Sequence, residues 1–212
     1  MAVKEHGNWR SFRHRNYRIL FPANAASNIG TWAQRVAQDW LILQLTNNSG
    51  TYLGLVTAVQ FAPVLFFSLH GGALADRVNK RKLLIFTNFV GGLSSLGLGL
   101  LVLAGNVKIW HVFFFALTLG IASALDAPIR QSFTSEIVGH SDIANAVSLN
   151  SANFNAGRLV GPALSGFLIA RFDTGPSFLI NALTYLFVVF LLLRMSQCTL
   201  SYGNRIIHIK GF

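Results

Sequence analysis

The chain has 212 residues, of which 52% are hydrophobic and 11% charged, and its formal net charge is +10. An ordinary soluble domain carries about a quarter of its residues as charges, and a disordered chain is both less hydrophobic and more charged, so this composition excludes both classes. Cys198 is the single cysteine, which excludes a disulfide framework and a thiolate metal cluster.

Six apolar segments follow one another along the chain, and each is long enough for a helix that crosses a bilayer core of about 30 Å. Short turn-like links rich in Asn, Gly and Ser connect most of them and make neighbouring helices antiparallel. The sequence therefore predicts an all-α integral membrane protein built as a six-helix bundle. In chain order the predicted spans are 17–45, 52–75, 83–107, 109–133, 143–170 and 172–194.

Basic residues are distributed unevenly between the two sides of this topology. Twelve of the 17 Lys and Arg lie on the side that holds both termini, whereas only Lys108 and Arg171 lie on the other side. An excess of Lys and Arg marks the cytoplasmic side, so both termini are predicted to be cytoplasmic. The positive charge is a topology signal, and nucleic acid is not expected as a partner. The twelve residues are Lys4, Arg10, Arg13, Arg15, Arg18, Arg77, Lys80, Arg81, Lys82, Arg194, Arg205 and Lys210.

Composition divides the chain into three parts. Residues 1–18 form a basic cytoplasmic segment, residues 19–194 the six-helix domain, and residues 195–212 a polar cytoplasmic tail. Aromatic residues alternate with arginines in the first part, which favours a segment at the lipid headgroups; a solvated basic tail is the alternative. The tail is interpreted either as the start of a cytoplasmic loop or as the end of a truncated reading frame.

A dense motif lies between the second and third spans. A glycine permits close helix approach, an acid accepts hydrogen bonds near the positive end of the third helix, and a basic run holds the turn on the cytoplasmic side. By itself this is a positive-inside loop. In this order and at this position it resembles the loop signature of the major facilitator superfamily. The matching residues are Gly72, Asp76, Arg77, Lys80 and Arg81.

The fifth span carries a second motif of small residues. Gly157, Gly161 and Ser165 recur every four residues and form one face on which a neighbouring helix can pack closely, with Pro162 beside it. Together with Gly166, this stretch is similar to the span-5 motif of exporters in the same superfamily. It favours efflux over uptake.

The phrases at 32–40 and 125–131 resemble a bacterial branch of the superfamily that includes the enterobactin exporter, and the resemblance covers residues 10–195. It implies the N-terminal half of a twelve-helix transporter in the bacterial inner membrane. The expected activity is secondary active, proton-coupled efflux of a small amphipathic organic compound, siderophore or drug-like. Ala116 stands where many proton antiporters carry an arginine, so the sequence leaves the coupling ion open.

The resemblance also implies a charge network at the cytoplasmic mouth that controls conformational switching. Its members are Asp76 and Lys80 of the loop motif. Asp126, near the inner end of the fourth span, is the expected acidic partner of Lys80, and Arg130 lies one turn further on.

Polar residues form a continuous stripe on the first span, and such a stripe must avoid lipid. Arg35 and Asp39 are four residues apart, so the stripe is either a self-satisfied ion pair that holds the bundle or the lining of a substrate cavity. The fifth span has a comparable polar line, with interhelical hydrogen bonding as the alternative to a cavity. The candidate cavity or coupling residues are Asn28, Arg35, Gln38, Asp39, Asn150, Asn153 and Arg158.

No pattern in the sequence matches a zinc site, a phosphate-binding loop or a nucleophile elbow, so neither an enzyme nor a cofactor is expected. The expected partners are a small organic substrate, protons and the lipid bilayer, together with a missing C-terminal half or a second copy. The alternative function is a truncated membrane fragment that transports nothing unless it meets a second half or forms a homo-oligomer.

Overall fold

The structure is a computed structural model that describes residues 9–77 and 79–195, with the side chains of residues 68–77 outside the description. Within these residues each predicted span forms one α-helix, and a short 3-10 helix precedes them. The fourth helix continues to Val138, past the predicted end at residue 133. The elements are η1 (Arg10–Arg13), α1 (Arg15–Leu45), α2 (Gly50–Arg77), α3 (Lys80–Leu103), α4 (Ile109–Val138), α5 (Ile143–Phe172) and α6 (Gly175–Arg194).

The turns between helices use residues that tolerate left-handed backbone. Asn47 and Asn48 between α1 and α2 have φ values of 51° and 63°, and Gly139 between α4 and α5 has a φ of 69°. Asparagine and glycine adopt such angles more readily than other residues. At the start of α3, the Asn79 side chain accepts a hydrogen bond of 3.1 Å from the Lys82 amide. The ends of α1 and α4 and the start of α3 therefore have local causes that the sequence displays.

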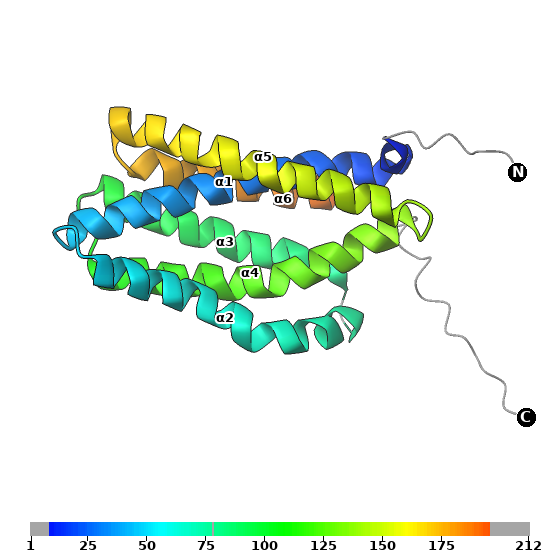
Figure 1. The fold of residues 1–212 in the computed structure, drawn as a ribbon, viewed down its shortest axis with the longest axis horizontal. Helices are drawn as coiled ribbons and strands as arrows, with labels where there is room; N and C mark the ends of the chain where they lie inside the picture. Colours follow the sequence, from blue (N-terminus) through cyan, green and yellow to red (C-terminus); the bar gives the residue numbers. More distant parts are fainter. Residues whose placement is uncertain (1–8, 78, 196–212) are drawn as a thin grey trace, which may run out of the picture.

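The helices lie lengthwise beside one another and alternate in direction (Figure 1). The start of α1, the end of α6 and the α2–α3 and α4–α5 connections lie at one end of the bundle, which we call the η1 end; it is on the right in Figure 1. The other three connections lie at the opposite end. The main packing pairs are α3 with α6, α2 with α4, α1 with α5, α1 with α6 and α3 with α4.

Four of the helices are long and apolar enough to cross a membrane: α2 over Gly50–Phe67, and the whole of α3, α4 and α6. The two others, α1 and α5, are just as long, but polar side chains interrupt them. These two helices pack against each other along the bundle. Some of the polar residues that distinguish them, such as Gln38 and Asn153, are buried, whereas Asn155 and Arg158 on α5 are exposed.

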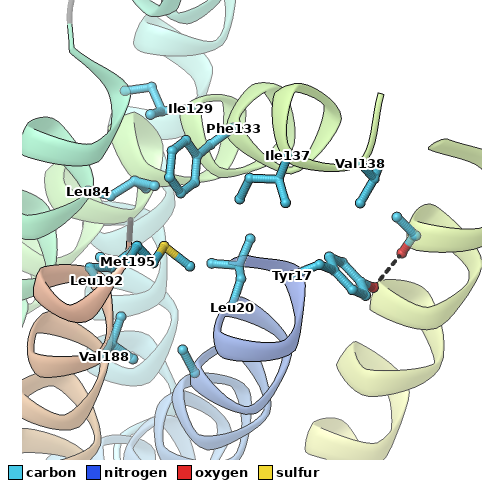
Figure 2. Close-up of a cluster of buried hydrophobic side chains, with 12 residues drawn as sticks. Tyr17, Leu20, Leu84, Ile129, Phe133, Ile137, Val138, Val188, Leu192 and Met195 are labelled. Atoms are coloured by element: carbon cyan, nitrogen blue, oxygen red, sulfur yellow. Dashed lines mark hydrogen bonds between the residues drawn. The ribbon is translucent and has the colours of Figure 1, made fainter. Parts of the chain in front are cut away.

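Two buried hydrophobic clusters hold the two ends of the bundle together. At the η1 end, Tyr17, Leu20, Phe133 and Leu192 pack in one cluster drawn from five helices (Figure 2). The Tyr17 hydroxyl donates a hydrogen bond of 3.3 Å to the carbonyl of Ala146 on α5. This bond links α1 to α5 at the η1 end. The second cluster, at the opposite end, contains Ala37, Leu41, Ile42, Val56, Leu98, Val112, Ala116 and Phe178.

The small residues of α5 lie against α1. A Cβ atom added to Gly161 would come within 2.6 Å of Trp32 Cβ and 2.8 Å of the Ile29 carbonyl oxygen, and one added to Gly157 would lie 2.8 Å from Asn28 Cβ. Two helices that approach this closely have no room for side chains between them. Gly166 differs, because an added Cβ would meet nothing within 4 Å.

Candidate functional site

A cavity of about 750 Å³ opens between α1, α4 and α5, with α3 and α6 at its floor. Its lining combines polar and apolar side chains, which suits an amphipathic molecule of drug size. Five of the residues singled out in the sequence line it: Asn28, Arg35, Asp126, Arg130 and Asn150.

The floor of the cavity holds a partly buried ion pair between two residues of α4. Arg130 Nε donates to Asp126 Oδ2 over 2.6 Å, and Arg130 Nη2 donates to Asp126 Oδ1 over 3.0 Å. This is the two-pronged geometry that makes arginine–carboxylate pairs strong and directional. Arg130 also reaches α1 and α3, because its Nη1 donates to Asn24 Oδ1 over 2.6 Å and its Nη2 to Asn88 Oδ1 over 3.4 Å.

The carboxylate of this pair has further donors on α3. Thr87 Oγ1 and Asn88 Nδ2 each donate to Asp126 Oδ1 over 2.8 Å. A buried ion pair repays its desolvation only when such additional hydrogen bonds satisfy both partners. We call Arg130, Asp126, Asn24, Asn88 and Thr87 the arginine network. Sequence reasoning found its two charges and missed Asn88 and Thr87, although polar residues within an otherwise apolar third span were the available signal.

The expected pairing of Lys80 with Asp126 is corrected by the structure. Lys80 Nζ instead pairs with Glu136, which lies near the end of α4. Glu136 is ten residues beyond Asp126, which corresponds to about 15 Å along a helix. Because α4 continues to Val138, its acidic residue at the η1 end is Glu136, and Asp126 is deeper in the bundle and already held by Arg130.

Of the remaining residues of the loop motif, Arg81 is the one whose side chain the structure describes. Arg81 Nε donates to the Leu192 carbonyl over 2.8 Å and its Nη2 to the Leu193 carbonyl over 2.7 Å, so the guanidinium satisfies the last turn of α6. The side chains of Gly72, Asp76 and Arg77 lie outside the described residues, where only the backbone of α2 is placed.

The polar residues of the α1 stripe contact different neighbours, and only some of them line the cavity. Among the described residues Arg35 forms no ion pair with Asp39, and its guanidinium carbon lies 4.4 Å from the centre of the Trp32 ring and 5.0 Å from that of Phe61. Gln38 is buried and donates to Gln60 Oε1 on α2 over 2.9 Å. Gln38 and Asp39 are absent from the described lining of the cavity, whereas Arg35 is part of it.

The polar residues of α5 likewise have different surroundings. Asn150 lines the cavity, but Asn153 is buried and donates to the Phe21 carbonyl on α1 over 3.3 Å. Arg158 is exposed, outside the described cavity lining, with its guanidinium carbon 5.4 Å from the Trp32 ring centre. Interhelical hydrogen bonding therefore accounts for the placement of Asn153.

A second polar network, which sequence reasoning missed, joins α1, α3 and α6 away from the cavity. Gln34 Oε1 accepts hydrogen bonds of 2.6 Å from both Ser95 Oγ and Asn181 Nδ2. Thr184 Oγ1 donates to Asn181 Oδ1 over 2.9 Å. We call Gln34, Ser95, Asn181 and Thr184 the glutamine network. It is uncharged, and Gln34, Ser95 and Asn181 are buried.

The described part of the N-terminal segment packs on the protein. Ser11 donates from its amide and its hydroxyl to Asn145 Oδ1, over 3.0 and 2.8 Å. Arg10 and His14 lie 3.5 and 3.1 Å from the carboxylate of Asp142, which precedes α5. Specific contacts with α5 thus hold residues 10–14, which sequence reasoning had assigned to headgroups or solvent.

Comparisons with known proteins show the family to which the chain belongs. A family of transmembrane secretion effectors matches residues 6–201. The staphyloferrin A transporter of Staphylococcus aureus is 30% identical over 177 residues, which cover 83% of this chain and 44% of that protein. The multidrug efflux pump Tap of Mycolicibacterium fortuitum is 29% identical over 157 residues, 72% of this chain and 38% of the pump. The enterobactin exporter EntS of Shigella flexneri is 23% identical over 157 residues, 74% of this chain and 38% of the exporter. The chain therefore spans less than half the length of these relatives.

Proposed function

The chain belongs to the transmembrane secretion effector family of the major facilitator superfamily, and from this premise we propose that it forms the N-terminal half of a secondary active efflux transporter. The proposed substrate is a small amphipathic organic compound, siderophore or drug-like, in keeping with what the names of its relatives state for them. The observation that carries the proposal is the cavity of about 750 Å³, with the arginine network at its floor, in a bundle of apolar helices.

Exposed polar residues on α5 support the proposal that a second half is needed. Ser151 and Asn155 are exposed although they line the cavity, and both lie in the middle part of a helix that spans the bundle. Polar groups at this depth require a protein partner or a water-filled path, because lipid offers them no hydrogen bonds. A C-terminal half, or a second copy of the chain, supplies the opposite wall of the cavity.

The proposed orientation places the η1 end in the cytoplasm of a bacterial cell, with the bundle in the inner membrane. The imbalance of basic residues supports it. Cysteines introduced at Asn48 or Asn106 in a Cys198→Ser background are expected to react with an impermeant thiol reagent added outside the cell. A cysteine at Asn79 is expected to stay unlabelled, and labelling of that position alone would reverse the orientation.

The proposed gate is the contact of the α2–α3 connection with α4 and α6. Lys80 pairs with Glu136, Arg81 binds the end of α6, and Asp76 belongs to the same connection in the sequence. Switching between inward-open and outward-open states requires contacts that form in one state and break in the other. Exchangeable charge pairs at a helix end meet this requirement better than buried apolar contacts.

The test of the function is efflux of an amphipathic dye from loaded bacterial cells, run once with neutral Nile red and once with the fluorescent carboxylate pyrenebutyrate. Cells that coexpress the chain with a separately encoded C-terminal half of a family member are expected to lose the dye faster than cells with either part alone. A protonophore is expected to abolish the difference. If both parts are folded in the membrane and both dyes are retained in every arrangement, the proposed function is wrong.

A further inference from the structure

The cavity has one cation without a matching anion. The titratable side chains in its described lining are Arg35, Asp126, Arg130 and Tyr185. Asp126 and Arg130 neutralise each other in the arginine network, and tyrosine is uncharged near neutral pH. The remaining charge is the guanidinium of Arg35, so the described lining carries one net positive charge.

Aromatic rings hold Arg35 in place without using its hydrogen-bond donors. Its guanidinium carbon lies over the rings of Trp32 and Phe61, at 4.4 and 5.0 Å from the ring centres. Such cation–π contacts attract the positive charge of the group. The five N–H donors of arginine lie in its plane and point outward from its edge. The rings therefore hold the side chain without supplying an oxygen acceptor for these donors.

Arg35 has no carboxylate or carbonyl acceptor among the hydrogen bonds and ion pairs of the described residues. Its Nε atom is buried without a hydrogen-bond partner, and Asp39, one turn further along α1, forms no ion pair with it. An unpaired charged donor in a desolvated site costs free energy. The two Nη groups are not among the buried unpartnered atoms, so an oxyanion in the cavity meets the guanidinium through them.

We propose that Arg35 is the recognition residue for an organic carboxylate, and that the cavity selects monoanionic amphipathic acids over neutral or cationic compounds of the same shape. The proposal rests on the proposed function, because it names the substrate class of that cavity. A carboxylate matches the planar edge of a guanidinium through two parallel hydrogen bonds.

The wall next to Arg35 accepts the apolar body of such an acid. Phe154 lines the cavity, and its ring packs edge-on against Trp32 with 5.8 Å between ring centres. An aromatic acid with its carboxylate at Arg35 places its ring system along this wall. Arg130 makes no second anion site, because Asp126 and two asparagines already accept its hydrogen bonds.

The test uses three probes that share a naphthalene body and differ in charge: 2-naphthoate, 2-naphthamide and 2-naphthylmethylammonium. Binding to the full chain in phosphatidylcholine nanodiscs is measured by equilibrium dialysis with radiolabelled probes. We expect naphthoate to bind about tenfold more tightly than naphthamide, and the ammonium probe to bind most weakly. This comparison uses the unmodified chain, so it holds even if a variant fails to fold.

Variants identify the residue responsible. Arg35→Gln is expected to lower the affinity for naphthoate about tenfold and to leave that for naphthamide unchanged. Arg35→Lys keeps the charge but loses the planar edge, so an intermediate affinity is expected. The matched control is Arg171→Gln, which removes an exposed arginine at the end of α5 outside the cavity lining and is expected to change neither affinity.

The outcomes separate this inference from the proposed function. Equal binding of naphthoate and naphthamide overturns the inference and leaves the cavity as a ligand site. Absence of binding by all probes also overturns the inference, whereas the function is overturned by failed efflux from the coexpressed halves. Equal losses in Arg35→Gln and Arg171→Gln assign the effect to general charge and overturn the inference. So does displacement of naphthoate by phosphatidylglycerol added to the nanodiscs, which would mark a lipid headgroup site. Selective naphthoate binding by a chain that exports no dye even when it is coexpressed with a C-terminal half supports the inference and contradicts the function.

Discussion

The arginine network and the glutamine network each join three helices, but they differ in charge and surroundings. The arginine network faces the cavity and contains an ion pair whose two side chains each retain 18% exposure. The glutamine network is neutral, lies away from the cavity, and has 3% exposure at Gln34 and none at Ser95. A sealed neutral network fixes helices relative to one another, whereas a charged network at a cavity can exchange partners.

This difference divides the bundle into a rigid side and an adaptable side. On the rigid side α1, α3 and α6 pack closely: a Cβ added to Gly91 would lie 2.9 Å from the Tyr185 ring, and one added to Gly99 would lie 3.0 Å from Leu179. On the other side α4 and α5 enclose the cavity together with α1, and their polar groups line it. We expect a ligand or a second half to contact these groups. Substitutions in the two networks are expected to have different consequences.

The largest effect is expected for Arg130→Met, which leaves the Asp126 carboxylate buried without its cation. Removal of one partner of a fully buried pair costs about 3–5 kcal/mol of folding free energy, and the 18% exposure of each side chain here places the expected loss at the lower end of this range. Thermal unfolding of the chain in detergent measures the loss. The double variant Arg130→Met with Asp126→Asn is expected to recover a large part of it, because no unpaired charge remains. Equal stability of the single variant and the unmodified chain would mean that water reaches the pair freely.

The next effect is expected for Gly161→Leu, at the close contact of α5 with α1. The new side chain meets Trp32 Cβ and the Ile29 carbonyl, and forced overpacking costs about 1–3 kcal/mol. Gly166→Leu on the same helix is the matched control, because it extends into open space. The measurement is the yield of monodisperse protein together with its melting temperature. Similar melting of the two variants would place the α1–α5 contact elsewhere.

A smaller effect is expected for Ser95→Ala in the glutamine network. It removes one hydrogen bond to Gln34, and such a loss costs about 1 kcal/mol. Melting in detergent is expected to shift slightly, while naphthoate binding stays unchanged because the network does not line the cavity. A change in ligand affinity would show that the rigid side takes part in binding.

The smallest effect on stability, with a large effect on transport, is expected for Glu136→Gln. A partly exposed ion pair contributes about 0–1 kcal/mol to stability, so melting is expected to stay nearly the same. Dye efflux in the coexpression assay is expected to fall sharply, as it is for Asp76→Asn, if these charges form the gate. Asp173→Asn, an exposed acid at the α5–α6 connection outside the described cavity lining, is the matched control and is expected to keep efflux. Full efflux by Glu136→Gln would reduce the motif to a topology signal.

The sequence by itself determined the number of helices and placed their ends to within five residues. These features are local: the length of an apolar run limits a helix in a bilayer, Asn79 caps the start of α3, and Gly139 and the Asn47–Asn48 pair follow helix ends at backbone angles that these residues adopt readily. The charges of the cavity were also visible, because ionisable residues such as Asp126 and Arg130 stand out in apolar segments.

Only the tertiary structure decided which polar residues meet. Asn88, Gln34 and Glu136 gain their roles from partners 42, 61 and 56 residues away in the chain. Helical periodicity shows which residues share a face. It does not show which helix packs against that face, or how the two helices are aligned along their axes. Asp126 and Glu136 lie on the same helix, and it was the position of α3 against α4 that brought Lys80 to Glu136 and left Asp126 to Arg130.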